Sequence, residues 1–155
     1  MKAALTGVHH VKIWVSDLAR SRSWYERVLG LEHRISFEDD DGVIRGMSFG
    51  VPGAGFQIAL RENPGLARAL SDADPFGLEA TREGLDAWAA RLDELGVPHS
   101  PIVRASSGYA MGFRDPDGVQ IRLYAADERV HAALDGEAET ERVYRPGPLP
   151  TVESD

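Results

Sequence analysis

A short segment near the start of the chain alternates between apolar residues and residues that could do chemistry. The apolar positions are Val11, Ile13 and Val15, and the intervening positions are His10, Lys12 and Trp14. Such alternation is typical of a half-buried strand whose apolar side faces the core, so the other three side chains share the opposite face. An imidazole can transfer a proton or bind a metal, and an ammonium group can bind an anion. The segment therefore predicts a face for ligand binding or catalysis.

Two later segments, residues 55–60 and 118–123, share the pattern Gly-apolar-Gln-Ile-x-Leu. If both are strands, each places its Gln on one face together with the residues that follow at alternate positions. Amide, guanidinium and phenol groups on such a face can hydrogen-bond to an organic ligand. The side chains grouped in this way are Gln57 with Ala59, and Gln120 with Arg122 and Tyr124.

The order of the expected elements is repeated along the chain. A strand over residues 8–15 leads into a helix that begins after Asp17 and ends near Gly30, and further strands follow. In the second half, the alternating residues 76–80 lead into a helix that ends at Gly96. Together with the shared closing pattern, this order predicts two tandem βαβββ modules. They extend over about residues 5–61 and 75–125, with a linker at 62–74 and a C-terminal helix and loose Pro-rich tail at 126–155.

Length and composition limit the classes of function. The chain has 155 residues, 43% of them hydrophobic, which suits one domain with an ordinary core. Its net charge of -8 disfavours nucleic acid and anionic membrane surfaces as partners. Without cysteine there is no disulfide, thiolate metal site or cysteine nucleophile. The sequence shows neither a secretory signal nor a run long enough to cross a bilayer, so we expect a cytoplasmic protein.

Several motifs resemble those of one known superfamily. Residues 10–18, followed by Trp24-Tyr25 and Leu29-Gly30, are similar to the opening of glyoxalase, bleomycin resistance and extradiol dioxygenase proteins, the vicinal oxygen chelate superfamily. Residues 113–118 resemble the turn before the final strand of those proteins. The resemblance extends to about residue 125. It implies an α+β fold in which two βαβββ modules form a curved, mostly antiparallel eight-stranded sheet around a central pocket, and it implies a homodimer.

The resemblance also allows the superfamily's metal-ligand positions to be checked. They correspond here to His10 and Ala59 in the first module and to Pro75 and Arg122 in the second. Only His10 retains a side chain that coordinates metal, and the Arg122 guanidinium would repel a cation. We therefore expect no cofactor. The sequence leaves one alternative open, a divalent ion such as Zn, Ni, Mn or Fe.

This metal alternative depends on the alignment of the second module. Shifting the alignment by one residue places Asp74 at the position of Pro75, and a relocated site could combine His9, His10, Asp74 and Gln57. Against this, His9 should point to the helix side of the sheet if His10 faces the pocket.

Two functions remain open at this point. The first is a metal-independent protein that binds, and so sequesters, a small aromatic or acidic molecule, with Lys12 and Arg122 together receiving a carboxylate, enolate or phenolate. The alternative is a glyoxalase- or dioxygenase-like enzyme (lyase, isomerase or dioxygenase). Such an enzyme would use altered metal ligands, or His10 as the base and Arg122 as the oxyanion stabiliser. The sequence does not identify the ligand. The residues predicted to bind it are Lys12, Trp14, Gln57, Gln120, Arg122 and Tyr124.

Overall fold

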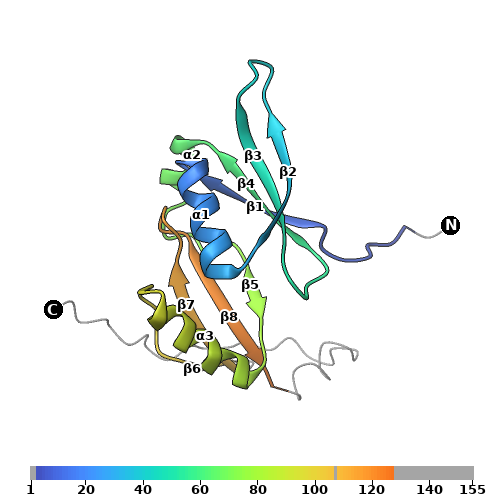
Figure 1. Cartoon of the computed structure of the whole chain (residues 1–155). Coiled ribbons are helices and arrows are strands. Elements are labelled where there is room, and N and C mark those ends of the chain that lie inside the picture. Colours follow the sequence, from blue (N-terminus) through green and yellow to red (C-terminus); the bar gives the residue numbers. More distant parts are fainter. Residues whose placement is uncertain (1–2, 107, 128–155) are drawn as a thin grey trace.

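The computed structural model describes residues 3–106 and 108–127 (Figure 1). The helix and tail expected at 126–155 lie almost wholly outside this range. The described elements follow the order βαβββ twice, with one extra helix between the two copies, which confirms the expected α+β fold. They are β1 (His10–Val15), α1 (Leu18–Leu29), β2 (Glu32–Glu38), β3 (Ile44–Gly50), β4 (Gln57–Glu62), α2 (Pro64–Ala69), β5 (Gly77–Glu79), α3 (Arg82–Glu94), β6 (Val103–Ala105), β7 (Gly108–Arg114) and β8 (Gln120–Ala126).

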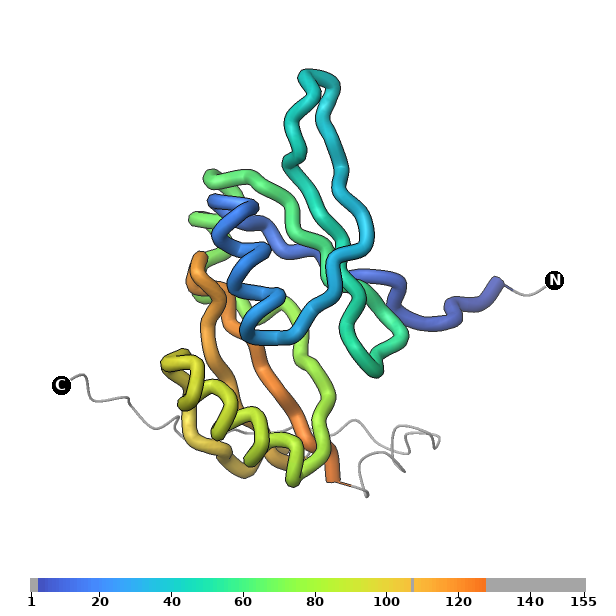
Figure 2. The backbone as a smooth tube through the Cα atoms, viewed as in Figure 1, coloured from blue at the N-terminus to red at the C-terminus, as the bar shows by residue number. Residues whose placement is uncertain are grey.

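The eight strands divide into two four-stranded sheets, one for each module. Their orders are β1-β4-β3-β2 and β5-β8-β7-β6. In each sheet the opening and closing strands pair in parallel, and the remaining pairs are antiparallel. The backbone trace shows the first module above the second in this view (Figure 2). The strands are thus those expected, but hydrogen bonding does not join them into one continuous sheet.

The registers of the two parallel pairs confirm how the repeat is aligned. Lys12 pairs with Ala59 in the first sheet, and Gly77 pairs with Arg122 in the second. Because Ala59 and Arg122 occupy the same place in the repeated pattern, Lys12 and Gly77 are equivalent. Pro75, two residues before Gly77, is then the equivalent of His10.

Local signals in the sequence explain where α1 begins and ends. The Asp17 side chain accepts a hydrogen bond from the backbone N–H of Arg20, as an N-cap should. Gly30 ends the helix with φ at 68°, a left-handed conformation that favours glycine. Both helix boundaries match the sequence prediction. In the described part of the chain, no helix is long and apolar enough to cross a membrane.

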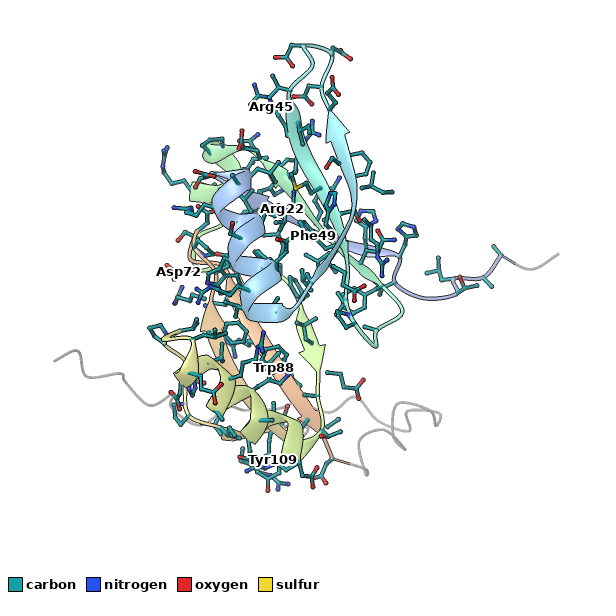
Figure 3. All side chains as sticks on the ribbon, in the orientation of Figure 1. Arg22, Arg45, Phe49, Asp72, Trp88 and Tyr109 are labelled. Atoms are coloured by element: carbon teal, nitrogen blue, oxygen red, sulfur yellow. The ribbon has the colours of Figure 1, made fainter. Side chains whose placement is uncertain are left out.

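A single hydrophobic core connects the modules. It includes residues of both sheets and both long helices, such as the buried Phe49 of β3, and the half-buried Trp88 of α3 packs against it (Figure 3). The centroids of the Trp24 ring in α1 and the Phe113 ring in β7 are 6.2 Å apart. Because Ile13 and other apolar residues of β1 face this core, the side chains at the alternate positions of β1 lie on the opposite face of the first sheet.

Candidate ligand-binding site

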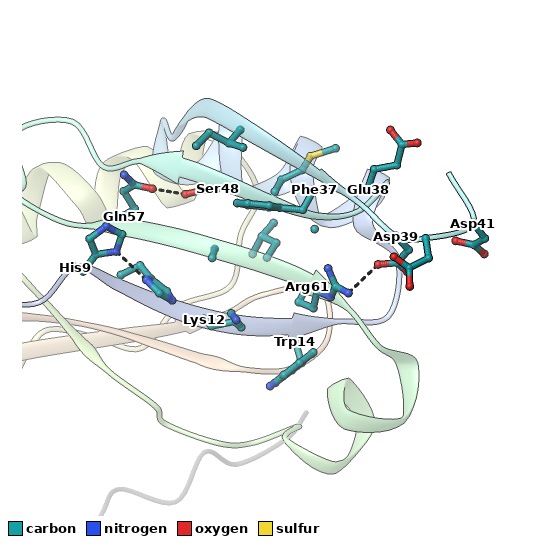
Figure 4. A pocket seen from close by; sticks show the side chains of 17 residues that line it. His9, Lys12, Trp14, Phe37, Glu38, Asp39, Asp41, Ser48, Gln57 and Arg61 are labelled. Atoms are coloured by element: carbon teal, nitrogen blue, oxygen red, sulfur yellow. Dashed lines mark hydrogen bonds and ion pairs between the residues drawn. The ribbon is translucent and has the colours of Figure 1, made fainter. Parts of the chain in front are cut away.

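A cavity of about 950 Å³ lies over the first sheet, on the face away from the core (Figure 4). Its walls come from the start of β1, from β2, β3 and β4, and from the acidic turn between β2 and β3. The structure brings together four of the predicted site residues here, His10, Lys12, Trp14 and Gln57. The face of β1 predicted from alternation is therefore correct. The roles of these residues in binding or catalysis stay predictions.

Lys12 supplies the cation of this cavity. Its side chain is exposed and projects beside Ala59, its partner on β4, which has no polar group to offer. The ammonium group makes no hydrogen bond or ion pair with any residue in the described part of the chain. An unpaired ammonium at the floor of a concave site can bind an anionic group of a ligand.

Gln57 and Ser48 form a polar pair next to Lys12. The Ser48 hydroxyl is buried and donates a hydrogen bond to Oε1 of Gln57. This bond holds the amide group in one orientation. The serine was missed in the sequence because a single Ser within an apolar strand carries no pattern of its own.

Apolar walls complete the middle of the cavity. Ile35 and Phe37 alternate along β2 and contribute exposed side chains, 51% and 46% accessible, to one wall. Trp14 contributes an aromatic ring from β1. Sequence reasoning missed Ile35 and Phe37, although their alternation is the same kind of signal that identified the face of β1.

The far end of the cavity is a charged network at the β2–β3 turn. Asp39 accepts ion pairs from Arg61 Nη2 at 2.9 Å and from Arg45 Nε at 2.9 Å. Arg61 reaches this turn by passing over Gly46, where its Nη1 would lie 3.3 Å from an added Cβ atom. The Arg61 charge is therefore neutralised at the rim, away from Lys12.

His9 and His10 lie together at the opposite end. Their Nδ1 atoms are 2.9 Å apart, so one imidazole donates to the other. Both residues line the cavity, and the expectation that His9 points to the helix side is wrong. The reason is that β1 begins at His10, so the strand alternation does not extend to His9.

The predicted site residues of the second module do not line this cavity. Arg122 Nε forms an ion pair with Asp74 Oδ2 at 2.8 Å, and its Nη2 donates to Gln120 Oε1 at 3.1 Å. The Tyr124 ring lies against Gly77. Within one chain, the structure therefore does not bring Lys12 and Arg122 together on a shared ligand.

The residues at the superfamily's metal positions do not fit a metal ion. Ala59 has no donor atom, and Pro75 is the register equivalent of His10. The carboxylate of Asp74, the alternative ligand, is already bound by Arg122. Over residues 3–106 and 108–127, no three His, Asp or Glu side chains are grouped so that they could hold a metal. A divalent ion normally needs three or four protein ligands, so this donor set is insufficient.

Comparisons with known proteins place these features in context. A family profile described as Glyoxalase/Bleomycin resistance protein/Dioxygenase superfamily matches residues 7–123. The putative ring-cleaving dioxygenase MhqA of Bacillus subtilis (strain 168) is 27% identical over 131 residues, which cover 80% of this chain and 42% of MhqA. The chain thus spans less than half the length of this curated relative.

Solved structures show the same fold. The glyoxylase/bleomycin resistance protein/dioxygenase domain from Frankia sp. EAN1pec is 25% identical with a TM-score of 0.63, covering 80% of this chain and 100% of that one. TnmS3, an antibiotic binding protein from Streptomyces sp. CB03234, is 24% identical with a TM-score of 0.68, covering 81% of this chain and 100% of that one.

Proposed function

Because this chain belongs to the glyoxalase/bleomycin resistance protein/dioxygenase superfamily, we propose that it is a metal-independent binding protein for a small aromatic organic acid. The observation that carries the proposal is the Lys12 ammonium, which has no partner among the described residues, in a cavity of about 950 Å³. A cavity of this size is in the range that holds drug-sized molecules, roughly 300–1,000 Å³. The acid group of the ligand would contact Lys12.

The apolar walls favour a flat ligand. Trp14 and Phe37 present aromatic surfaces to the cavity (Figure 4). Ile35 adds an aliphatic surface from β2. Aromatic rings pack well against such surfaces, and each stacked pair contributes roughly 0.5–1.5 kcal/mol beyond the area it buries. An aromatic ring that carries a carboxylate or phenolate would satisfy both the walls and Lys12.

Binding without chemistry is supported by the donor set and by one structural neighbour. The metal positions hold Ala59, Pro75 and an Asp74–Arg122 ion pair, which cannot polarise a substrate as a metal ion would. TnmS3, described as an antibiotic binding protein, shares the fold, so this architecture is compatible with binding a small molecule.

We also propose that two copies pair. The cavity is open to solvent, and the apolar residues Ile35 and Phe37 on its wall are half exposed. A second copy would cover these residues, since superfamily members commonly form dimers. Light scattering after gel filtration would measure the mass of the particle in solution. A monomer at micromolar concentration would count against pairing without affecting the binding proposal.

The binding proposal is tested by calorimetric titration of the aromatic acid 2-naphthoate into the wild-type protein, Lys12→Met and Arg82→Met. Arg82→Met is the matched control, since it also removes one cation, but on α3 and outside the cavity. A charge-assisted hydrogen bond is worth about 1.5–3 kcal/mol, so Lys12→Met should weaken binding at least about tenfold. Arg82→Met should leave the affinity unchanged. Equal losses in both variants would refute the role of Lys12.

Metal independence is tested separately by elemental analysis of the purified protein. We expect no stoichiometric divalent metal, and the same 2-naphthoate affinity before and after chelator treatment. A bound metal that His10→Ala removes would overturn the metal-free proposal.

One observation favours a second candidate, an enzyme. The 27% identity to a putative ring-cleaving dioxygenase suits an enzyme that acts on an aromatic substrate, and His10 lies in the cavity, where it could transfer a proton to or from that substrate. Arg122 does not reach that cavity in the same chain, so an oxyanion role for it would need the second copy. Consumption of oxygen or loss of the bound aromatic acid over time, abolished by His10→Ala, would replace the binding proposal with this one.

A further inference from the structure

We infer that Ser48 is a positioning residue that sets the selectivity of this cavity. By fixing the amide of Gln57 with its nitrogen toward the ligand, Ser48 creates, together with Lys12, a subsite for a carboxylate. The inference rests on the proposed function and deepens it, because it names the functional group that the ligand must carry at this end of the cavity.

The positions of Ser48 and Gln57 follow from the pairing of β3 with β4. Ser48 pairs with Ala59, and Gly50 pairs with Gln57, so the two polar side chains are diagonal neighbours on the same face. Ser48 is only 5% exposed, and its hydroxyl donates to Gln57 Oε1. Gly50 has no side chain, and the guanidinium of Arg34, which is paired with Glu32, lies over it: Arg34 Nε would be 2.9 Å from an added Cβ atom.

The hydrogen bond leaves the amide nitrogen free. A carboxamide has an acceptor oxygen and a nitrogen with two N–H donors. Oε1 is occupied by Ser48, while Nε2 makes no hydrogen bond with any residue of the described ranges. Since Gln57 lines the cavity, its unused donors are available to a ligand.

Lys12 adds further donors on the same face. His10 pairs with Gln57 and Lys12 pairs with Ala59 in the parallel β1–β4 ladder, so Lys12 is one diagonal step from Gln57. Lys12 has only donors, and the hydrogen bond from Ser48 keeps the Gln57 oxygen on the Ser48 side, so the amide presents its N–H donors to the ligand. A carboxylate accepts hydrogen bonds only and carries negative charge, so it matches this pair. An amidinium group has the same planar shape but would face N–H groups and a like charge.

The experiment uses three probes of one shape, namely 2-naphthoate, 2-naphthamide and 2-naphthamidine. Their dissociation constants are measured by calorimetry with the wild-type protein, Ser48→Ala, Ser48→Thr and Gln57→Glu. We expect the wild-type protein to prefer naphthoate over naphthamide by about tenfold or more, from the added charge. Naphthamidine should bind weakest.

Each variant has its own expected result. Ser48→Ala frees the amide to rotate, so the ratio of naphthamide to naphthoate dissociation constants should fall by roughly threefold, the effect of one neutral hydrogen bond. Ser48→Thr keeps the hydroxyl and should restore the ratio. In Gln57→Glu, Ser48 still donates to one carboxylate oxygen while the other oxygen faces the ligand. The affinity for naphthoate should therefore fall about tenfold or more, and the affinity for naphthamidine should rise.

The outcomes separate this inference from the proposed function. Suppose that naphthoate binding depends on Lys12, but Ser48→Ala and Gln57→Glu leave the relative affinities for the three probes unchanged. The inference is then wrong and the binding proposal stands. If no probe binds the folded wild-type protein, both are wrong. Gln57→Glu removes no atoms from the core, so it tests the orientation of the amide even if Ser48→Ala does not fold.

Discussion

The two modules share a backbone plan but differ in what covers the cavity face of the opening strand. Lys12 in β1 and Gly77 in β5 are equivalent positions. Arg61 leans away from Lys12, across Gly46 toward Asp39, whereas its equivalent Tyr124 lies directly over Gly77. The first face is therefore open, and the second is covered by its own side chain.

The polar groups on the two faces differ in the same way. In the second module, the Arg122 charge is balanced by Asp74, and Arg122 also donates to Gln120. In the first module, Lys12 has no such partner among the described residues. A duplicated fold can therefore keep one copy as a binding surface while the other satisfies its polar groups internally.

The turns before the closing strands differ as well. The first module has Val51-Pro52-Gly53-Ala54-Gly55, without a carboxylate, while residues 115–118 of the second include Asp115 and Asp117. Asp115 Oδ2 accepts a hydrogen bond from the buried Tyr25 hydroxyl at 2.9 Å, and Asp117 forms an ion pair with Arg20 at 2.8 Å. Burial, and next the Asp115 charge, raise the pKa of Tyr25 well above its usual value, so the phenol remains a donor. Through these two contacts the second turn holds α1 of the first module.

The largest expected effect comes from removing this second-turn carboxylate. Asp115→Ala leaves the backbone N–H groups of Asp117 and Val119 and the Tyr25 hydroxyl without their acceptor inside the protein. An unsatisfied buried group costs about 1–3 kcal/mol, so we expect a loss of about 3 kcal/mol in the free energy of unfolding, measured in urea.

The control for this loss is Asp115→Asn. Asparagine keeps the oxygen that accepts hydrogen bonds from both N–H groups, and its amide can donate to the Tyr25 oxygen. The free energy of unfolding should therefore fall by about 1 kcal/mol or less. An alanine variant as stable as the asparagine variant would show that the two turns do not differ in importance.

The contrast between the modules also shows what sequence could predict. Alternation predicted the shared face of His10, Lys12 and Trp14, and the Gln-containing repeat predicted which positions of the two modules are equivalent, because both depend on the two-residue period of a strand. The directions of long side chains were not predictable. Whether Arg61 turns to Asp39, or Arg122 to Asp74, depends on which charges the tertiary structure brings near.

A second comparison concerns the covered position itself. In Gly77→Ala, the new Cβ atom would lie 2.7 Å from the Tyr124 ring, so the ring must move. Overpacking of this kind typically costs 1–3 kcal/mol, and we expect about 1 kcal/mol because the ring is only partly buried. The matched change Lys12→Ala should alter stability by less than about 0.5 kcal/mol, as for an exposed side chain.

The ring contact is isolated by combining Gly77→Ala with Tyr124→Ala. If the clash is the cause, Gly77→Ala should cost almost nothing once the ring is gone, as measured by a double-mutant cycle in urea. An unchanged cost in the double variant would mean that Tyr124 does not cover this face.

The smallest effect is a pH dependence that only the second turn should confer. Burial raises the pKa of Asp115 above its ordinary value, although the hydrogen bonds from Tyr25, Val119 and Asp117 act in the opposite direction. With the folded pKa higher than the unfolded one, the folded state binds more protons between the two values. The stability contributed by Asp115 is therefore full below its unfolded pKa and declines as pH rises through the folded pKa.

The difference between the wild-type protein and Asp115→Asn isolates this contribution, because all other titrating groups are shared. Urea unfolding from about pH 3.5 to 7 should show the wild-type advantage over Asp115→Asn shrinking as pH rises and then becoming constant. An advantage that grows with pH would mean that the hydrogen bonds to Asp115 outweigh its burial, and that the turn stabilises its ionised form.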